Sequence, residues 1–453
     1  MTTDTAARPG RPPGPELGLF ASLSRIRRRQ LTGFLDDLRA EYPRITYVRL
    51  GDEHAYVLFD PELARSLFAD HGRHTTKGRG LERARLLLGD GLLTSEDPVH
   101  RSQRRLVQPA FHAGRIAAYA EIMRAEAERQ AATWTDGAPV LMAAEMGRLT
   151  LRIAGRALFG SDLPERDVHT VVRAVATLLT GFGRLLMPRV LGLLPTPRNL
   201  RLLGARNDLD ALVYRLIAEH RTSGDRGDLL SMLLAARDEA GEPMPDRQVR
   251  DEVLTLLLAG HETTAMALTW TWLLLARHPE AAARLQAEVD AVGAEPAALP
   301  YTRAVLAESM RVRPPAWIIS RRAAADLDLD GWRVPAGTLV VTSPWVTHRD
   351  DRWWGDGQAF RPERWLTADG TFDEAAPGQP RGAYFPFGAG RRMCIGESFA
   401  WTEGVVVLAT LARQWAPEVR PETSDRVHPA ITLRPADHTP MVLRRRSDVL
   451  SAG

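Results

Sequence analysis

The sequence is nearly devoid of cysteine and of lysine, and each scarcity limits what the chain can be. Its 453 residues contain one cysteine, Cys394, so no disulfide can form within the chain and cysteine usage indicates no redox compartment. Lys77 is the only lysine among 59 basic residues. The 56 acidic residues nearly balance them, which excludes a protein that coats a polyanion through net positive charge. Cys394 is therefore either an inert thiol or a residue used for chemistry.

The sequence also lacks an early apolar run that suits a signal peptide or a membrane span. Residues 1–15 are polar and rich in proline and glycine, and we expect a flexible N-terminus there. The best candidate span, 253–276, carries His261 and Glu262 near its middle. A central acid costs a few kcal/mol on insertion into a bilayer, so this run is predicted to be a buried core helix. We expect a cytoplasmic protein without a membrane span.

Helical periodicity dominates the chain from residue 61 to about residue 311. The clearest helical runs are 116–134, 141–159, 200–220 and 246–277. Proline-rich breaks interrupt them, and no repeat or low-complexity linker divides the chain. Although a chain of this length usually holds about three domains, these features favour a single domain over 1–453.

Short β-like runs near both ends of the sequence predict a small β lobe, formed by about 44–60, 316–342 and 427–444. Runs 45–50 and 55–59 alternate in polarity around a Gly-Asp pair and predict a hairpin. Runs 427–434 and 441–444 suggest a closing hairpin. The predicted fold class is mainly α with a small β domain.

Cys394 stands directly before a predicted helix in a segment rich in glycine and arginine, Phe387-Gly388-Ala389-Gly390-Arg391-Arg392-Met393-Cys394-Ile395-Gly396. Glycines let the backbone approach a planar ligand, while main-chain N–H groups and a helix N-terminus favour a thiolate. The arginines suit carboxylates. A cysteine alone is more often a structural core residue. The full pattern Phe-x-x-Gly-x-Arg-x-Cys-x-Gly instead favours a thiolate that ligates a cofactor.

In this pattern the sequence resembles the cytochrome P450 family of haem-thiolate monooxygenases. Glu308-Ser309-Met310-Arg311 is similar to the family's Glu-x-x-Arg pair, and 360–365 is similar to the segment that supplies a third arginine, Arg364. A Glu-x-x-Arg pair alone is usually a solvated helix pair. The resemblance implies a structural role for Glu308, Arg311 and Arg364, in a triangular, mostly helical prism that encloses the haem.

The resemblance also implies haem b, with the Cys394 thiolate as axial ligand to the iron. The expected cofactor-binding residues are His100, Arg104, Arg321, Phe387, Arg392 and Cys394. His100 and Arg104 share one helix face and, with Arg321 and Arg392, are expected to bind the two propionates. Arg322 is adjacent to Arg321, so the register of the strand decides between them. Phe387 is expected to pack against the macrocycle.

The long predicted helix contains Ala259-Gly260-His261-Glu262-Thr263-Thr264. Glycine followed by two β-branched residues is unfavourable in a helix, so we expect it to loosen here and admit dioxygen and water. The resemblance implies that Thr263 hydrogen-bonds oxygen at the iron and that Glu262 serves a water-linked proton relay. A zinc-protease His-Glu-x-x-His fails because Ala265 occupies its last position. The remaining alternative is a pair of ordinary core hydroxyls.

Small or apolar residues are the candidates for the substrate pocket, namely Leu92, Leu93, Ala259, Ala316, Trp317, Ile318 and Ile431, with 180–194 as a further segment. They favour a hydrophobic, mid-sized substrate. The segment 89–100 and the proline-rich start resemble bacterial oxygenases of terpenoid and polyketide pathways. We therefore place a terpenoid first and a macrocyclic polyketide second.

The resemblance implies that O2 is consumed and that a ferredoxin and its NAD(P)H-dependent reductase supply electrons, because the short stretch after Cys394 leaves no room for a fused reductase. No nucleic-acid partner is expected. The same chemistry could also give desaturation, ring closure or oxidative coupling. A non-catalytic haem sensor or carrier of hydrophobic ligands is the alternative of another class, and Glu262-Thr263 argues against it because a carrier needs no proton relay.

Overall fold

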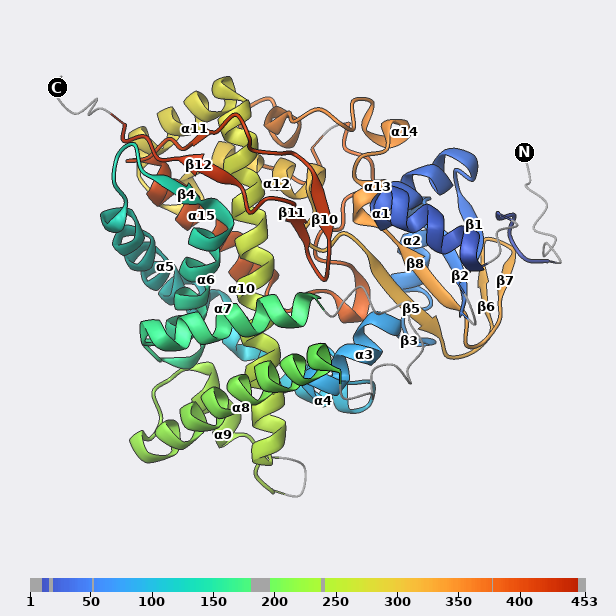
Figure 1. Ribbon diagram of the computed structural model, residues 1–453, viewed down its shortest axis with the longest axis horizontal. Helices are drawn as coiled ribbons and strands as arrows, with labels where there is room; N and C mark the ends of the chain where they lie inside the picture. The colour runs from blue at the N-terminus through green and yellow to red at the C-terminus, as the bar shows by residue number, and fades with distance from the viewer. Residues whose placement is uncertain are drawn as a thin grey trace.

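Helices form most of the computed structural model, which describes residues 10–15, 19–50, 53–180, 196–237, 241–376 and 378–446 (Figure 1). The α-helices are α1 (Leu19–Glu41), α2 (Pro61–Ala69), α3 (Arg79–Leu88), α4 (Val99–Val107), α5 (Ala113–Thr133), α6 (Met142–Phe159), α7 (Glu165–Thr180), α8 (Pro197–Ser223), α9 (Leu229–Ala235), α10 (Asp246–Arg277), α11 (Pro279–Val292), α12 (Pro300–Val312), α13 (Pro344–Thr347), α14 (Asp351–Trp354) and α15 (Glu397–Ala412). Short 3-10 helices are η1 (Gln108–Phe111), η4 (Pro296–Ala298), η5 (Pro362–Trp365) and η6 (Gly390–Arg392).

The strands are short and gather into small sheets. They are β1 (Ile45–Leu50), β2 (Glu53–Leu58), β3 (Thr75–Lys77), β4 (Pro139–Leu141), β5 (Ile319–Ala323), β6 (Leu327–Leu329), β7 (Trp332–Val334), β8 (Leu339–Thr342), β9 (Glu418–Val419), β10 (Val427–Pro429), β11 (Leu433–Pro435) and β12 (Pro440–Val442). The predicted class, mainly α with a small β portion, is confirmed.

Helix α10 runs through the middle of the helical part (Figure 1). It has the bounds that the periodicity predicts and packs against α6, α8, α12 and α15. Its second half is buried almost without interruption, as a helix that is apolar on all sides must be. His261 and Glu262 are buried within it, so this run is a core helix. Of the helices in the described ranges, none is long and apolar enough to cross a membrane.

The largest sheet has the strand order β1-β2-β8-β5-β3 and lies beside the helical part (Figure 1). β1 and β2 form the predicted hairpin, and β2 continues into a parallel pairing with β8. Because side chains alternate across a strand, neighbouring residues of β2 face opposite cores. Tyr56 packs in a core that includes Leu67 of α2, whereas Val57 packs in a core that includes Phe34 of α1.

The C-terminal strands pair differently from the predicted closing hairpin of 427–434 with 441–444. β10 and β11 form a hairpin with each other. β12 pairs instead with β4 and β9. The prediction was wrong because a strand can pair with a segment distant in sequence, and a local pattern does not identify that partner.

Part of the predicted flexible N-terminus is held against the sheet. The Pro13 carbonyl accepts hydrogen bonds from the N–H of Tyr47 and the hydroxyl of Thr46, both at 3.0 Å. The Arg11 guanidinium lies 4.3 Å from the centre of the Tyr47 ring. These contacts hold residues 10–15 in place, which corrects the prediction for this part of 1–15. Residues 1–9 lie outside the described residues.

Candidate functional site

Cys394 lies in a tight turn between η6 and α15. The N–H of Cys394 donates to the Phe387 carbonyl at 3.0 Å, and the N–H of Met393 donates to the Gly390 carbonyl at 3.1 Å. Gly390 has a φ of +70°, and a Cβ at this position would lie 2.3 Å from the carbonyl oxygen of Phe68 in α2. Only glycine fits there, so the turn can press against α2 and hold the cysteine at a fixed place.

The Cys394 side chain is exposed, and yet desolvation by burial raises the pKa of its thiol. Protein atoms thus surround the sulfur closely enough to desolvate it, although solvent still reaches the side chain. The N–H of Gly396 and the charge of Arg104 act in the opposite direction, lowering this pKa. The predicted preference for thiolate is therefore outweighed by desolvation, and the free thiol is neutral at neutral pH. A metal ligand must be the thiolate, so binding there releases a proton.

Four side chains predicted to bind the cofactor form one cluster beside this turn. The cluster consists of His100 and Arg104 of α4, Arg321 of β5 and Arg392 of η6. Nη1 of Arg104 donates to the Met393 carbonyl at 2.8 Å, so this arginine also holds the cysteine turn. His100 is buried, and burial together with the charges of Lys77 and Arg392 lowers its pKa to about 4. The imidazole is therefore neutral at neutral pH.

The register of β5 places Arg321 in this cluster and Arg322 outside it. Arg322 forms ion pairs with Glu82 at 2.7 Å and with Glu53 at 3.1 Å. Arg321 is buried, and its Nη1 donates to the Ser320 carbonyl at 3.0 Å. Among the described residues, no carboxylate forms a salt bridge with it. Burial and the charge of Arg392 lower the pKa of Arg321 to about 10.

The cluster holds more positive charge than the acids around it neutralise. Glu96 forms an ion pair with Arg392, while Arg321 has no such partner in the part of the chain that the structure describes. Desolvating a guanidinium without a carboxylate is costly, and two carboxylates of a ligand would offset that cost through charge-assisted hydrogen bonds. The residues present therefore fit a cofactor that carries two carboxylates and a metal within reach of one thiolate, as haem does.

Two residues of this cluster were missed by the sequence analysis. Lys77 of β3 is buried, and the N–H of the same residue donates to Oε1 of Glu96 at 2.7 Å. Glu96 thus joins β3 to Arg392. The signal for Lys77 was its being the only lysine of the chain, but a count does not show where the strand places it. Glu96 carries no signal of its own in the sequence.

Helix α10 remains continuous across residues 259–264, so the predicted loosening is wrong for this structure. Thr263 Oγ1 donates to the Ala259 carbonyl at 2.6 Å, and Thr264 Oγ1 donates to the Gly260 carbonyl at 3.2 Å. These bonds to the residue four positions earlier occupy the hydroxyls without opening the helix. Ala259, Gly260 and Thr263 are half-buried, and a Cβ on Gly260 would meet no atom within 4 Å. This face of α10 therefore borders open space.

Glu262 points to the C-terminal hairpin. Its Oε1 accepts a hydrogen bond from the Thr432 hydroxyl at 2.8 Å and forms an ion pair with Nε of Arg434 at 3.2 Å. Glu262 is buried, whereas its neighbour Thr263 is half-buried, so the acid and the alcohol have different surroundings. The sequence analysis did not foresee Thr432 and Arg434 as partners, because they lie about 170 residues away and carry no motif.

Glu308, Arg311 and Arg364 form a buried ionic network, as expected. Both Glu308 oxygens accept from Arg311 at 2.7 Å, and Nε of Arg364 lies 3.0 Å from Oε1 of Glu308. The remaining donors of Arg311 reach the carbonyls of His348, Gly357 and Ala359 at 2.7–2.8 Å. All five N–H groups of this guanidinium are thereby used. The network fixes the segments after α13 and α14 against α12.

The predicted pocket residues do not share one environment. Leu92 is buried, and Ala259, Ala316 and Ile318 are half-buried. Trp317 is 0% exposed, packs in the core with Phe34 and donates from Nε1 to the Ala430 carbonyl at 2.9 Å, so its assignment to the pocket is corrected to a packing role.

Two more candidates lie at an exposed surface, with Leu93 at 36% and Ile431 at 49% exposure. Thr180 ends α7, and 181–194 lie outside the described residues.

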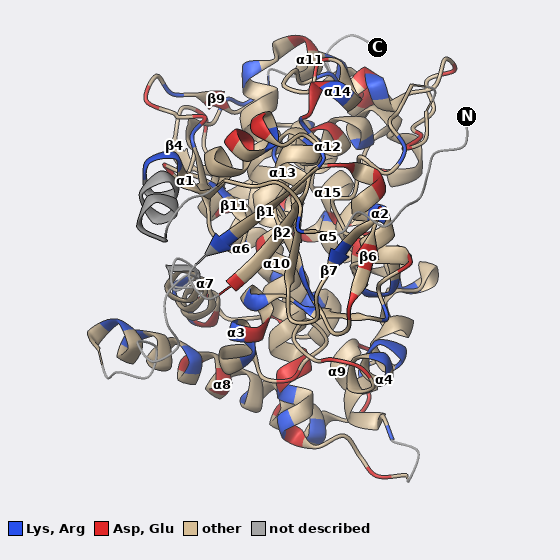
Figure 2. Ribbon diagram, turned by 90° about the vertical axis from the view of Figure 1, so that its right-hand side faces the viewer, with Lys and Arg blue, Asp and Glu red and all other residues tan. Residues whose placement is uncertain are grey.

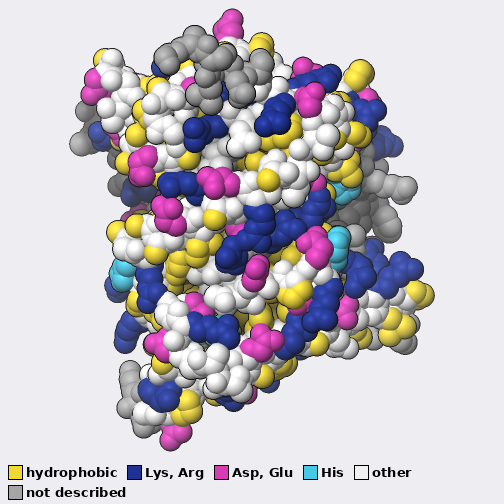
Figure 3. Space-filling view, turned by 90° about the vertical axis from the view of Figure 1, so that its left-hand side faces the viewer, with side chains coloured by type: hydrophobic (Ala, Val, Ile, Leu, Met, Phe, Trp, Pro, Cys, Tyr) yellow, Lys and Arg dark blue, Asp and Glu magenta, His cyan; other side chains and the backbone are white. Residues whose placement is uncertain are grey.

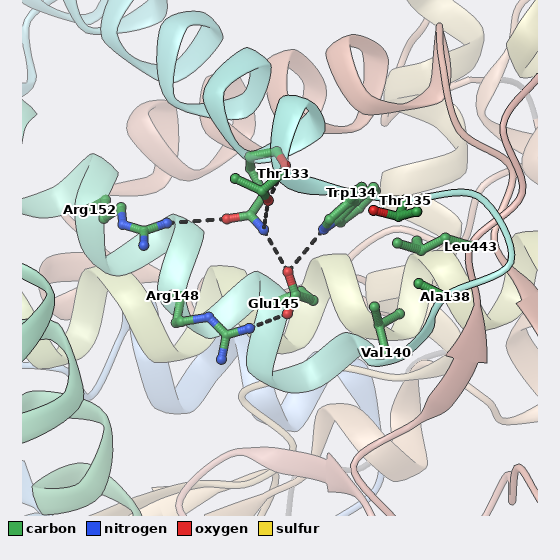
Figure 4. A pocket seen from close by; sticks show the side chains of 10 residues that line it. Thr133, Trp134, Thr135, Ala138, Val140, Glu145, Arg148, Arg152 and Leu443 are labelled. Carbon is green, nitrogen blue, oxygen red and sulfur yellow. Dashed lines mark hydrogen bonds and ion pairs between the residues drawn. The ribbon is translucent and has the colours of Figure 1, made fainter.

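A separate pocket of about 250 Å³ lies between α5, α6 and β4 (Figure 4). Glu145 points into it and accepts hydrogen bonds from Gln130 Nε2 at 2.5 Å, from Trp134 Nε1 at 2.9 Å and from Arg148. Arg152 donates to Oε1 of Gln130 at 3.2 Å. The polar groups of this pocket thus bind one another, which indicates a structural role.

Charges of both signs are mixed over the surface. Figure 2 shows acidic and basic residues interspersed along the ribbon, and Figure 3 shows basic side chains crossing the opposite face with acidic ones among them. Many of these form ion pairs, such as those of Arg129 and Arg156 with Glu126. This distribution agrees with the near balance of charge in the sequence, and neither of these two views shows a face of a single sign among the described residues.

Comparison with known proteins identifies the family to which the chain is similar. The family model described as "Cytochrome P450" matches residues 9–437. Cyclooctatin synthase of Streptomyces melanosporofaciens is 41% identical over 398 residues, which are 85% of this chain and 85% of that protein. Pentalenene oxygenase of Streptomyces avermitilis is 38% identical, over 87% of this chain and 88% of that protein.

A solved structure of a related protein has the same fold. The crystal structure of CYP175A1 from Thermus thermophillus superposes with a TM-score of 0.75 at 31% identity, over 93% of this chain and 97% of that one. The fold, the ionic network and the cysteine turn thus occur together with a match along nearly the whole sequence. The chain belongs to the cytochrome P450 family, whose members are oxygenases that hold haem through a cysteine thiolate.

Proposed function

We propose that this P450 uses haem b and oxidises a terpenoid, with Cys394 as the axial ligand. The observation that carries the proposal is the pairing of an accessible cysteine in a rigid turn with the cationic Arg321 and Arg392, beside which lies the neutral His100. Haem b presents one iron and two carboxylates to these groups. When bound, it supplies the activation of O2 for insertion of one oxygen atom into the substrate.

The chain's own residues position and protect the reacting groups. Arg321, Arg392, Arg104 and His100 would hold the propionates, and Phe387, whose ring lies 5.9 Å from that of Trp401, would pack against the macrocycle. The accessible face of α10 receives the substrate and dioxygen. There the Thr263 hydroxyl, which donates to the Ala259 carbonyl at 2.6 Å, would be the hydrogen-bond donor available beside the haem.

Proton delivery is assigned to Glu262. Its ion pair with Arg434 and its bond with Thr432 keep the carboxylate away from Thr263. Release from Arg434 lets the carboxylate take up a proton from solvent and pass it through water toward the Thr263 hydroxyl.

The terpenoid assignment rests on the names of two relatives, cyclooctatin synthase and pentalenene oxygenase, together with the apolar Leu92 and the small Ala259 and Ala316. A macrocyclic polyketide is the second substrate class. We further propose that a ferredoxin and an NAD(P)H-dependent ferredoxin reductase supply the electrons in the cytoplasm. Arg391, which is exposed and pairs with Asp97 at 3.5 Å, suits contact with an acidic partner.

The test is turnover by the purified holoenzyme with a ferredoxin, its reductase, NADPH and ¹⁸O2. A panel of cyclic terpenes and macrolactones serves as substrates. We expect a terpene to give a product that contains one ¹⁸O atom, with macrolactones unchanged. A product without ¹⁸O, or selective oxidation of macrolactones, would contradict the proposal.

A further inference from the structure

Lys77, the only lysine of the chain, contacts the main chain of residues 90–95, a stretch called the pocket segment here because it contains the pocket candidates Leu92 and Leu93. It lies in β3 and is 4% exposed. Its Nζ donates to the Leu92 carbonyl at 2.7 Å and to the Ser95 carbonyl at 2.6 Å. Two bonds from one ammonium to a short stretch of backbone fix the position of that stretch relative to β3.

The same lysine borders the cationic cluster proposed to bind the propionates. In the β3–β5 ladder Lys77 stands opposite Arg321. Burial, and after it the charge of Arg392, lowers the pKa of Lys77 to about 7, with Glu96, Arg321 and Glu252 as the other charged groups that act on it. His100 responds in turn to the charge of Lys77. Lys77 therefore lies between the anion site and the pocket segment.

Helix α10 holds the other side of this segment. The N–H of Leu92 donates to Oε2 of Glu252 at 2.9 Å, and the N–H of Asp90 donates to Oδ2 of Asp251 at 2.8 Å. Leu92 is thus hydrogen-bonded at its N–H to Glu252 and at its carbonyl to Lys77. The segment can lie close to α10 because a Cβ on Gly91 would be 2.4 Å from the Asp251 carbonyl oxygen, a place that only glycine can occupy.

We infer that Lys77 is a positioning residue that couples the propionate charges of the haem to the placement of residues 90–95 at the substrate pocket. The inference rests on the function proposed above. Two carboxylates near Arg321 and Arg392 offset the repulsion that these cations exert on Lys77 and keep its ammonium charged. A charged donor makes the stronger bonds to the Leu92 and Ser95 carbonyls. Cofactor binding thereby orders a part of the pocket that the cofactor itself does not form.

The first test reads the charge of Lys77 directly. Protein labelled with ¹³C-lysine gives one lysine signal, because the chain has one lysine. Its pH titration is followed by NMR in the reduced, carbon monoxide-bound holoenzyme. With native haem we expect a pKa of Lys77 about one to three units above the value with haem dimethyl ester, whose propionates carry no charge. Equal pKa values of Lys77 with native haem and with the ester overturn the inference.

The second test measures amide hydrogen exchange of residues 87–96 in holoenzyme carrying either native haem or the dimethyl ester. In the native chain the ester should speed exchange of this segment. In the Lys77→Met variant, amide exchange of this segment should already be fast with native haem, and the ester should change it little. Arg73→Met, an exposed neighbour that loses the same charge, serves as control and should behave like the native chain. Additive effects of the ester and of Lys77→Met would overturn the coupling.

The spectrum of each reduced, carbon monoxide-bound sample separates this inference from the proposed function. A spectrum without the band of a thiolate-ligated haem would contradict the function. The thiolate band together with uncoupled exchange would contradict only the role of Lys77.

Discussion

Burial sets the charge states of several side chains in the site. The pKa is lowered to about 4 for His100, about 7 for Lys77 and about 10 for Arg321, and in each case desolvation is the largest cause. Each of these groups therefore gains from a nearby negative charge. The thiol of Cys394 has its pKa raised by the same cause and gains from ligation by a metal. Haem would supply both stabilising partners, because its two carboxylates provide the negative charge near the three basic groups and its iron binds the Cys394 sulfur.

Thr263 gives a prediction at this scale. Its hydroxyl is half-buried on the open face of α10, so Thr263→Ala should remove a hydrogen bond to bound oxygen and leave the fold intact. We expect several-fold more hydrogen peroxide per NADPH and a matching loss of product, measured in the reconstituted system.

Thr271 supplies the matched control. It lies on the same helix, is fully buried and makes the same type of bond, to the Ala267 carbonyl at 2.8 Å. Thr271→Ala should leave the ratio of peroxide to product unchanged. Equal ratios in Thr263→Ala and the native enzyme would remove Thr263 from oxygen activation.

The element scale shows what patterns in the sequence can predict. The bounds of α10 follow from its apolar run, and the β1–β2 hairpin follows from alternation over a short loop, since both depend on neighbours in sequence. The partner of β12 depends on β4, some 300 residues earlier, and was predicted wrongly. Lys77 was missed for the same reason, because the pairing of β3 with the distant β5 brings it to the site. Arg434 lies in the local β10–β11 hairpin and was missed because its contact with Glu262 of α10 spans distant parts of the sequence.

The network around Arg311 gives a prediction for the elements it joins. Lysine has three donors and no fork, so Arg311→Lys would leave buried carbonyls and part of the Glu308 carboxylate unpartnered. We expect a loss of about 3–5 kcal/mol in the free energy of unfolding, measured by denaturant titration of the holoenzyme.

Arg284→Lys tests whether an arginine-to-lysine change destabilises the protein at any ion pair. Arg284 is exposed and pairs with Glu363 at 3.2 Å. A change within about 0.5 kcal/mol is expected there. A similar value for Arg311→Lys would show that the network does not stabilise the fold.

At the scale of the whole molecule, buried histidine links stability to pH. His348 is fully buried, its Nε2 accepts from the Phe385 N–H at 2.9 Å, and burial lowers its pKa to about 3. The unfolded chain binds a proton to this group near pH 6.5, while the folded chain does not until about pH 3. Stability is therefore fully present above pH 6.5 and is lost as the pH falls, by up to about 1.4 kcal/mol per pH unit from this group.

His348→Gln tests this link, because an amide oxygen can accept the Phe385 N–H without titrating. Denaturant midpoints of the variant should fall less steeply between pH 6.5 and pH 5 than those of the native enzyme. The exposed His428→Gln should keep the native slope. Parallel slopes in all three proteins would contradict a neutral His348 in the folded state.

The function of the whole molecule depends on its single cysteine, and the spectrum of the reduced, carbon monoxide-bound holoenzyme tests that claim most directly. The native enzyme should show the long-wavelength Soret band that thiolate ligation produces. Cys394→Ala should lose that band even where haem is retained, since the chain has no second cysteine. A native spectrum without the thiolate band, or a Cys394→Ala spectrum that keeps it, would contradict the assignment of Cys394 as the haem ligand.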